Sequence, residues 1–291
     1  MEKPLVFFVV IGIALVLVAY YGGSSVLNSG PIATGFGTGS DAPTPVLPAP
    51  LSFGGGSQTT KKKPEPGISP FQDAVWISTV RYSETDIKKE YITINSGGFF
   101  GFGDDEKKAV NLDSWTIENN NGVRHAIPPA VNIPYLDTAL RPIQLNPGDE
   151  VLIITGDSSF GSSFRENICT GYLNESNSFS PVLEESCPEF SNEDLLKQKL
   201  NAFCVDVVDR TRRCRQVIIG YENSAAGNDC IAFAQSHLNY SGCVKDHKNA
   251  EQFFTDTWRV FLKMREKLWN SLHDRIILRD KDGLIVDEYI Y

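Results

Sequence analysis

Seven short segments rich in β-branched and aromatic residues set the strongest limit on what this chain can fold into. They are AVWISTVRY, EYITIN, DSWTIEN, DEVLIITG, TWRVFL, DRIILRD and GLIVDEYIY. The turn signals NSGG, NNNG, NPGD and KDG bound most of them. Short segments of this composition between glycine- and asparagine-rich turns predict β-strands joined by hairpins and loops.

Side-chain alternation within these segments predicts which residues form the core. In EYITIN, Ile92 and Ile94 share one face, opposite Tyr91 and Thr93. Such a period of two, with one buried side, is typical of antiparallel sandwich sheets. The run VLIIT is apolar throughout, which predicts a central strand that is covered on both faces.

The same reasoning applies to the last segment and to a tryptophan. In GLIVDEYIY we expect Leu284, Val286 and Ile290 to share one face. In VNLDSWTIENNNG, Trp115 stands between two turns, and we expect it to fill the core between two sheets. Stacking on a ligand is the alternative role for this tryptophan.

The region 157–254 differs from the strands on either side. Ser191-Asn-Glu-Asp194 resembles a capping box, and apolar residues at helical spacing predict a helix from Glu193 to about Arg210. Further short helices are expected at 229–237 and 249–254. We interpret 157–254 as a mixed, partly helical insertion that divides a β domain into residues 71–156 and 255–291.

The N-terminal part of the chain has a composition of its own. Residues 5–21 are uncharged and apolar, nearly long enough to cross a hydrocarbon core of about 30 Å. We interpret residues 1–22 as a transmembrane signal anchor; a cleaved signal peptide and a buried core helix are the alternatives. Residues 23–70 are rich in Gly, Ser, Thr, Ala and Pro without periodicity, which predicts a linker.

All the cysteines lie in one window of the expected insertion. They are Cys169, Cys187, Cys204, Cys214, Cys230 and Cys243. An even, clustered number behind an export-type segment indicates disulfides formed in an oxidising compartment. We therefore expect most of the chain to be extracytoplasmic, with 15 pairings left open by the sequence.

The order and chemistry of the strand motifs resemble those of the lamin-tail domain family. Residues that fit its motifs are Glu90, Tyr91, Ile92, Asn95, Val110, Leu112, Trp115, Ile117, Leu145, Pro147, Gly148, Asp149, Ile277, Asp280, Gly283, Val286, Asp287 and Tyr289. The resemblance covers about 120 residues and implies an immunoglobulin-like β-sandwich that serves as an interaction or tethering module. Bacterial members occur in exported and surface-anchored proteins. The cysteine-rich insertion departs from the family.

One basic cluster is a candidate for anion contact. The sequence RTRRCR contains Arg210, Arg212, Arg213 and Arg215 near the expected end of a helix. Guanidinium groups bind phosphates and acidic polymers in a bidentate manner. A solvated helix end, where cations interact favourably with the helix dipole, is the alternative interpretation.

Other patterns are weaker candidates for enzyme or metal sites. Gly156-Asp-Ser-Ser-Phe160 resembles a hydrolase nucleophile motif, but no histidine follows an aspartate at the accompanying Asp-x-x-His spacing. Cys230, His237, Cys243 and His247 fit no common zinc spacing closely. The alternative to a binding protein is therefore an envelope hydrolase or metal-dependent enzyme in which Asp206, Asp209, His237 and His247 converge.

These observations together predict a non-enzymatic, membrane-anchored protein that acts in binding or scaffolding outside the cytoplasm. It would cross the cell membrane once, through residues 5–21, and its partner would be an unknown protein or envelope polymer. The formal net charge of −9 opposes nucleic-acid binding. No cofactor is expected.

Overall fold

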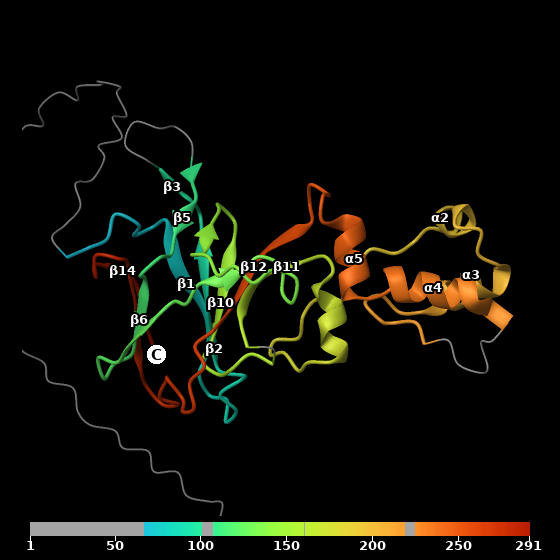
Figure 1. Ribbon diagram of the computed structural model, residues 1–291. Coiled ribbons are helices and arrows are strands. Elements are labelled where there is room, and N and C mark those ends of the chain that lie inside the picture. The colour runs from blue at the N-terminus through green and yellow to red at the C-terminus, as the bar shows by residue number, and fades with distance from the viewer. Residues whose placement is uncertain (1–66, 101–106, 160, 219–224) are drawn as a thin grey trace, which may run out of the picture. The chain divides into compact units, whose positions relative to one another are not determined.

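The protein is mostly β-sheet, with a few short helices and three disulfides (Figure 1). The computed structural model describes residues 67–100, 107–159, 161–218 and 225–291. The expected anchor and nearly all of the expected linker lie outside the described residues. None of the helices within the described ranges has the length and apolarity needed to cross a bilayer.

The larger sheet has six strands in the order β1-β2-β10-β12-β11-β8. These are β1 Val75–Arg81, β2 Tyr91–Ser96, β10 Glu150–Ile154, β12 Phe254–Phe261, β11 Ser163–Asn167 and β8 Ala130–Val131. β10 pairs with β12 in parallel, as β11 does with β8, and the other pairs are antiparallel. The sheet is thus mixed, whereas its sequence pattern suggested antiparallel pairing. A parallel pair requires a long crossover, and here residues 155–253 make it.

A second sheet has four antiparallel strands in the order β14-β13-β6-β7. These are β14 Ile285–Ile290, β13 Arg275–Arg279, β6 Thr116–Glu118 and β7 Arg124–Ala126. Two small pairs complete the strands: β3 Phe99–Phe100 with β4 Lys107–Lys108, and β5 Val110–Asn111 with β9 Gln144–Leu145.

The two larger sheets share one hydrophobic core. Ile92 and Ile94 of the six-stranded sheet and Val286 of the four-stranded sheet are buried in it together with Trp115, which is 1% exposed. The ring of Phe71 lies 5.4 Å from that of Trp115, measured between centroids. Trp115 therefore fills the space between the two sheets, as its position between two turns predicted.

The expected apolar face of the last strand is only partly buried. Val286 lies in the core, but Leu284 is half-buried and Ile290 is 59% exposed. β14 is an edge strand, and its pairing with β13 shifts register between Leu278 and Arg279. A register shift of this kind breaks strict alternation along the strand.

β10 is covered on both faces, as its continuous apolar sequence predicted. It lies between β2 and β12. Val151 and Ile153 face the core shared by the sheets, whereas Leu152 and Ile154 belong to a second core. That second core contains residues from the expected insertion, including Tyr172, Phe179 and Leu183.

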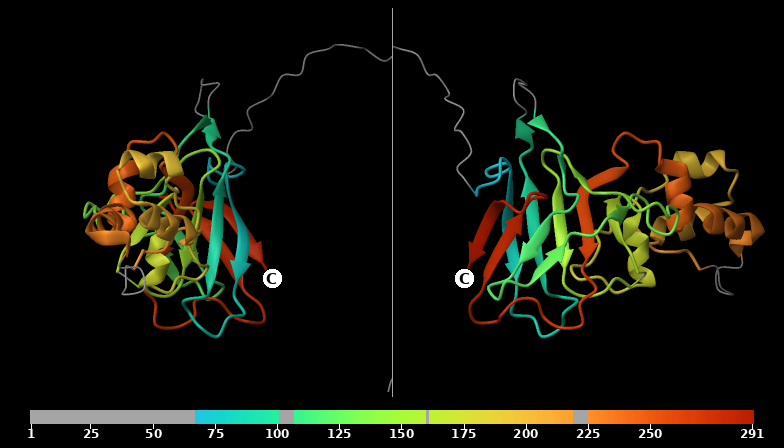
Figure 2. Two further views of the ribbon diagram at one scale, coloured as in Figure 1. Left: turned by 90° about the vertical axis from the view of Figure 1, so that its right-hand side faces the viewer. Right: turned by 60° about the vertical axis from the view of Figure 1, so that its left-hand side comes forward.

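The helices follow β11 and lie to one side of the strands (Figures 1 and 2). They are η1 Thr170–Glu175, α2 Asn192–Lys197, α3 Ala202–Arg210, α4 Gly227–His237 and α5 Tyr240–His247. A third core packs α2, α3 and α4 together through residues such as Leu195, Cys204 and Phe233. Residues 163–167, which the sequence pattern assigns to the insertion, instead form β11 within the six-stranded sheet.

The single helix expected over 193–210 is wrong, because the chain breaks it into α2 and α3. Lys199 has a φ of 57°, which no α-helix accommodates. Asn201 then starts α3 as its N-cap, accepting a hydrogen bond from the Cys204 N–H. The cap predicted at Ser191 is confirmed, since its side chain accepts from the Asp194 N–H. The helix expected at 249–254 is also wrong: α5 ends at His247 and β12 begins at Phe254.

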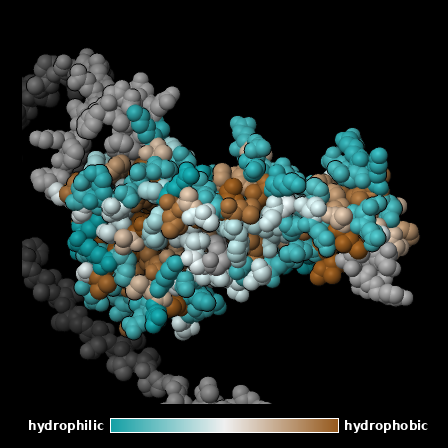
Figure 3. Space-filling view, in the orientation of Figure 1, coloured by the Kyte–Doolittle hydropathy of each residue, from teal (hydrophilic) through white to brown (hydrophobic). Residues whose placement is uncertain are grey.

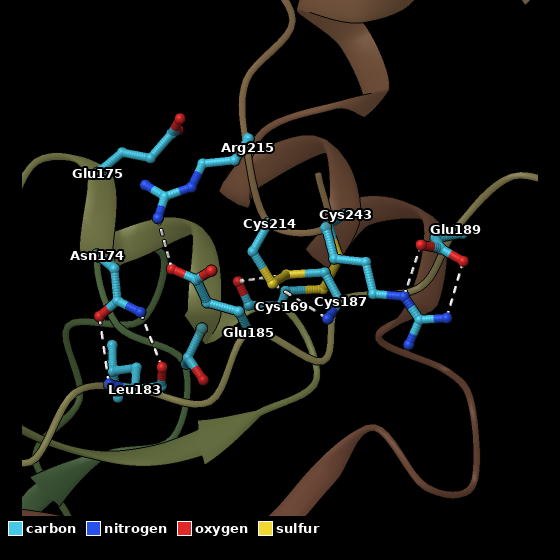
Figure 4. Close-up of a disulfide and its surroundings, with 12 residues drawn as sticks. Cys169, Asn174, Glu175, Leu183, Glu185, Cys187, Glu189, Cys214, Arg215 and Cys243 are labelled. Carbon is cyan, nitrogen blue, oxygen red and sulfur yellow. Dashed lines mark hydrogen bonds and ion pairs between the residues drawn. A yellow bond between two sulfur atoms is a disulfide. The ribbon is translucent and has the colours of Figure 1, made fainter. Parts of the chain in front are cut away.

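All six cysteines are paired. Cys169 bonds to Cys243, joining the segment before η1 to α5, and Cys204 bonds to Cys230, joining α3 to α4. Cys187 bonds to Cys214 between two loops (Figure 4). Disulfides therefore fasten the helical region both to itself and to the second core beside the six-stranded sheet.

Candidate functional site

The four arginines of the basic cluster begin at the C-terminus of α3 and continue into the loop that follows. Arg210 Nη2 lies 2.7 Å from Asp206 Oδ1, one helical turn earlier. Arg213 makes two bonds to Glu189, with Nε 2.6 Å from Oε1 and Nη2 2.8 Å from Oε2. The paired geometry is the bidentate form that a guanidinium adopts with carboxylates.

Arg215 contacts a third carboxylate. Its Nη2 lies 2.7 Å from Glu185 Oε1, close to the Cys187–Cys214 disulfide (Figure 4). Arg212 makes no ion pair with any residue that the structure describes. The cluster therefore joins loops of the disulfide-bonded region, with one arginine left for external contact.

A small pocket lies beside these arginines. Its volume is about 110 Å³. Arg212, Arg213 and Arg215 form its polar side, and Phe190, Val208 and Leu238 are among its apolar residues. The hydrogen bond from Arg213 lowers the pKa of Glu189, so this carboxylate remains charged and competes with any bound anion. The geometry thus favours a structural role for most of the cluster.

Several candidate residues for enzyme or metal sites are engaged elsewhere, whereas Asp209 lines the pocket beside the arginines and His247 ends α5. In the loop that follows β10, Asp157 Oδ1 accepts a hydrogen bond from the Ser158 N–H, as aspartate side chains often do in turns. Cys230 and Cys243 are in different disulfides, which removes both thiolates from the proposed zinc set. Asp206 pairs with Arg210, and His237 Nδ1 lies 2.7 Å from Asp246 Oδ2. Within the described ranges, no three His, Cys, Asp or Glu side chains are grouped so as to hold a metal.

A larger hollow opens at the edge between the two sheets. It has a volume of about 320 Å³ and lies between His125 of β7, Pro128, Leu140 and the end of β12 at Phe261. His125 pairs across the sheet with Ile117, a core residue, and its Nε2 is buried with no hydrogen-bond partner among the described residues.

The outer face of the six-stranded sheet presents a further group of side chains, which sequence reasoning missed. Trp76 of β1 pairs with Asn95 of β2, Asn95 pairs with Glu150 of β10, and Glu150 pairs with Thr257 of β12. One residue from each of four neighbouring strands therefore lies in a single transverse row. We call Trp76, Asn95, Glu150 and Thr257 the outer row.

Alternation places the outer row away from the shared core. The neighbours Val75, Ile94, Val151 and Trp258 are all buried in that core. Successive side chains of a strand point to opposite faces, so the outer row points outward. Trp76 is 41% exposed and the other three residues are half-buried.

Hydrogen bonds within this face hold its polar groups in place. Thr257 Oγ1 donates to Glu150 Oε1 at 3.1 Å. Ser78 Oγ donates to Asn95 Oδ1. These bonds leave the Asn95 amide NH₂ as a donor and Glu150 Oε2 as an acceptor on the same surface.

The row is a property of strand register, which explains why the sequence did not reveal it. Its members come from segments up to about 180 residues apart, and each alone is an ordinary strand residue. The available signal was alternation in AVWIS, where Trp76 lies between the inward-facing Val75 and Ile77. That pattern marks an outward tryptophan but does not identify its neighbours.

On the face drawn in Figure 3, hydrophobic residues form separate patches among hydrophilic ones instead of one continuous band. No family model, curated protein or solved structure matches this chain. The candidate sites therefore rest on geometry alone.

Proposed function

We propose that this chain is a membrane-anchored, extracytoplasmic binding or scaffolding protein. Residues 5–21 would cross the membrane, residues 23–70 would act as a spacer, and the rest would be a lamin-tail-like domain with an immunoglobulin-like sandwich at the cell surface. The observation that carries the proposal is the pairing of all six cysteines in three disulfides. Stable structural disulfides are typical of exported proteins and rare in the cytosol.

The burial of these disulfides strengthens this argument. Each of the six cysteines is at most 4% exposed, and the bonds link segments 26 to 74 residues apart. The helices of the third core are only 6 to 11 residues long, and short helices depend on tertiary contacts for their stability. A reducing compartment would therefore remove bonds on which this region depends.

The binding part of the proposal is supported by the outer row. An exposed tryptophan beside oriented amide and carboxylate groups offers both apolar contact and hydrogen bonding. Such a mixture is typical of sites that recognise a ligand by a few placed polar groups.

Location can be tested on the full chain, produced with a C-terminal tag in its native cells. The membrane fraction is isolated, and the tagged chain is denatured and treated with a maleimide, with or without prior reduction, so that free and disulfide-bonded cysteines are counted separately. We expect no label without reduction and six labels after reduction. Labelling without reduction, or recovery in the soluble cytosolic fraction, would contradict the proposal. A Cys204→Ser, Cys230→Ser variant should take up four labels and serves as the calibration.

A further inference from the structure

We propose that the outer row binds a neutral polysaccharide, whose sugar rings stack on Trp76 and hydrogen-bond to Asn95 and Glu150. This inference rests on the proposed function, because it names the ligand class of the same binding protein. It concerns the sheet face formed by β1, β2, β10 and β12.

Trp76 provides a flat apolar surface at one end of the row. Its ring lies above Gly97, where a Cβ atom, if there were one, would come within 3.5 Å of the indole. This is an ordinary van der Waals distance, so the indole packs against the chain at Gly97 while Trp76 remains 41% exposed. The face of an indole is electron-rich, and the C–H groups on one face of a pyranose ring are apolar and slightly positive. When a sugar stacks on Trp76, its C–H face therefore meets the electron-rich indole face and both apolar surfaces leave water.

The spacing of the row suits a chain of linked rings. Neighbouring strands lie about 4.8 Å apart, so the four side chains are distributed over about 14 Å. Sugar hydroxyls are both donors and acceptors, and among the described residues the Asn95 amide NH₂ and Glu150 Oε2 make no hydrogen bond, so both can bind a sugar. Because Ser78 and Thr257 already orient these two groups, little side-chain entropy is lost on binding.

Charge on this face selects a neutral polymer over an anionic one. Burial is the main cause that raises the pKa of Glu166, and the nearby carboxylates of Glu150 and Glu184 act in the same direction. Arg259, the cation among them, is 4% exposed and bonded to Glu166. Within the outer row itself the one charged side chain is that of Glu150, so a phosphate- or sulfate-bearing chain would meet a carboxylate there.

The edge of the sheet, in contrast, is closed to strand addition at this point. The backbone N–H of Ile77, which would pair with an added strand, donates to Asp287 Oδ2 at 2.7 Å. Contacts between β1 and β14 also cover this edge. Occupation of an edge N–H by a carboxylate opposes β-augmentation by a peptide. The second core covers the rest of this face at Leu152 and Ile154, so the partly exposed outer row is the accessible part, which favours a ligand that lies across the strands there.

The test uses the full chain in a detergent without a sugar head group, since maltosides would compete for the site. Sedimentation is measured with three insoluble neutral polysaccharides: cellulose, chitin and β-1,3-glucan. We expect retention on at least one of them, a drop of about tenfold in affinity for Trp76→Ala, and a smaller drop for Trp76→Phe. Glu150→Gln should weaken binding less than Trp76→Ala does.

Phe203→Ala is the matched control, because Phe203 is an exposed aromatic residue on α3, away from the row. Its binding should equal that of the unmodified chain. Soluble oligosaccharide of the retained polymer should release the protein, whereas dextran sulfate should not. Failure of all three polymers to retain the chain, or equal retention of Trp76→Ala, would overturn the inference. Extracytoplasmic disulfides found in the maleimide experiment would then still support the proposed location.

Discussion

Arg259 of β12 and Glu166 of β11 form an ion pair that is almost fully buried, with 4% and 9% of their side chains exposed. The same guanidinium also donates to the carbonyl groups of Pro181 and Val182. Its carbon lies 5.8 Å from the centroid of the Phe179 ring. One arginine therefore fastens the loop 179–182 to the outer face of the six-stranded sheet.

Removal of one partner of this pair should destabilise the fold strongly. Glu166→Ala leaves an uncompensated buried guanidinium, which costs about 3–5 kcal/mol in other proteins. Replacing both residues, as in Glu166→Leu with Arg259→Met, removes both charges, and we expect a loss smaller than the sum of the single losses. Urea unfolding of the unmodified chain, Glu166→Leu, Arg259→Met and the double variant measures this coupling. Additive losses would show that the two side chains do not act as a pair.

Glu118 should make stability depend on acid pH. Its carboxylate lies 2.8 Å from Arg279 Nε and 2.5 Å from Arg124 Nε, joining β6, β13 and β7. The hydrogen bond from Arg279 is the main cause that lowers the pKa of Glu118 in the folded protein. A lowered folded-state pKa means that the stabilisation is fully present above the unfolded value, about 4.3, and is lost as the pH falls through the folded value.

We therefore expect the free energy of unfolding to fall less steeply below about pH 4.3 in Glu118→Gln than in the unmodified chain. Urea midpoints at a series of pH values between neutral and acid measure the slope. Glu84→Gln is the control, because Glu84 faces Arg81 across 4.0 Å at an exposed site. Identical slopes for the Glu118→Gln and unmodified chains would contradict this account.

The disulfides should contribute unequally to the free energy of unfolding. Loop-entropy arguments give about 4.5 kcal/mol for the bond Cys169–Cys243, which closes 74 residues, and about 3.5 kcal/mol for Cys204–Cys230, which closes 26. The first joins residues of the second core, beside the sheet, whereas the second lies within the third core. Loss of Cys204–Cys230 should thus raise amide hydrogen exchange mainly in α3 and α4. Exchange spread equally over β10 and β12 would argue against separate cores.

The sequence predicted the elements that depend on local pattern. Strand segments were located by alternation and turns, the capping box at Ser191 was recognised, and VLIIT indicated a doubly covered strand. Each of these features follows from neighbouring residues alone, because side-chain alternation and helix capping depend on residues only a few positions apart.

Features that depend on distant pairing were not predictable. The parallel alignment of β10 with β12 is set by the path of residues 155–253, and the outer row follows from that register. The arginine cluster was correctly identified as basic, but its partners Glu185 and Glu189 come from a loop that folds back on it. Apolar spacing over 193–210 was misleading, since the break at Lys199 changes the phase and leaves Leu196 and Phe203 exposed.

Gly242 of α5 should tolerate no side chain. A Cβ at this position would overlap the carbonyl oxygen of Ser236 and the backbone of His237, at the last turn of α4. Alanine is the better helix former by about 1 kcal/mol, but overpacking typically costs about 1–3 kcal/mol, so we expect Gly242→Ala to lower the urea midpoint. Ser241→Ala, at the exposed neighbouring position, should leave the midpoint unchanged. A Gly242→Ala midpoint at or above that of the unmodified chain would show that the two helices can separate at no cost.

Replacement by alanine should cost far more stability at Trp115 than at Trp76. Trp115 is 1% exposed between the sheets, so Trp115→Ala creates a large cavity and should cost about 3–5 kcal/mol in the free energy of unfolding. Trp76 is 41% exposed on the outer face, and Trp76→Ala should change stability by about 0.5 kcal/mol or less. Urea unfolding compares the two variants, and sedimentation with the three polysaccharides is then performed with Trp76→Ala. A large loss of stability in Trp76→Ala would mean that this side chain holds β1 in place, and its use as a binding probe would have to rest on Trp76→Phe.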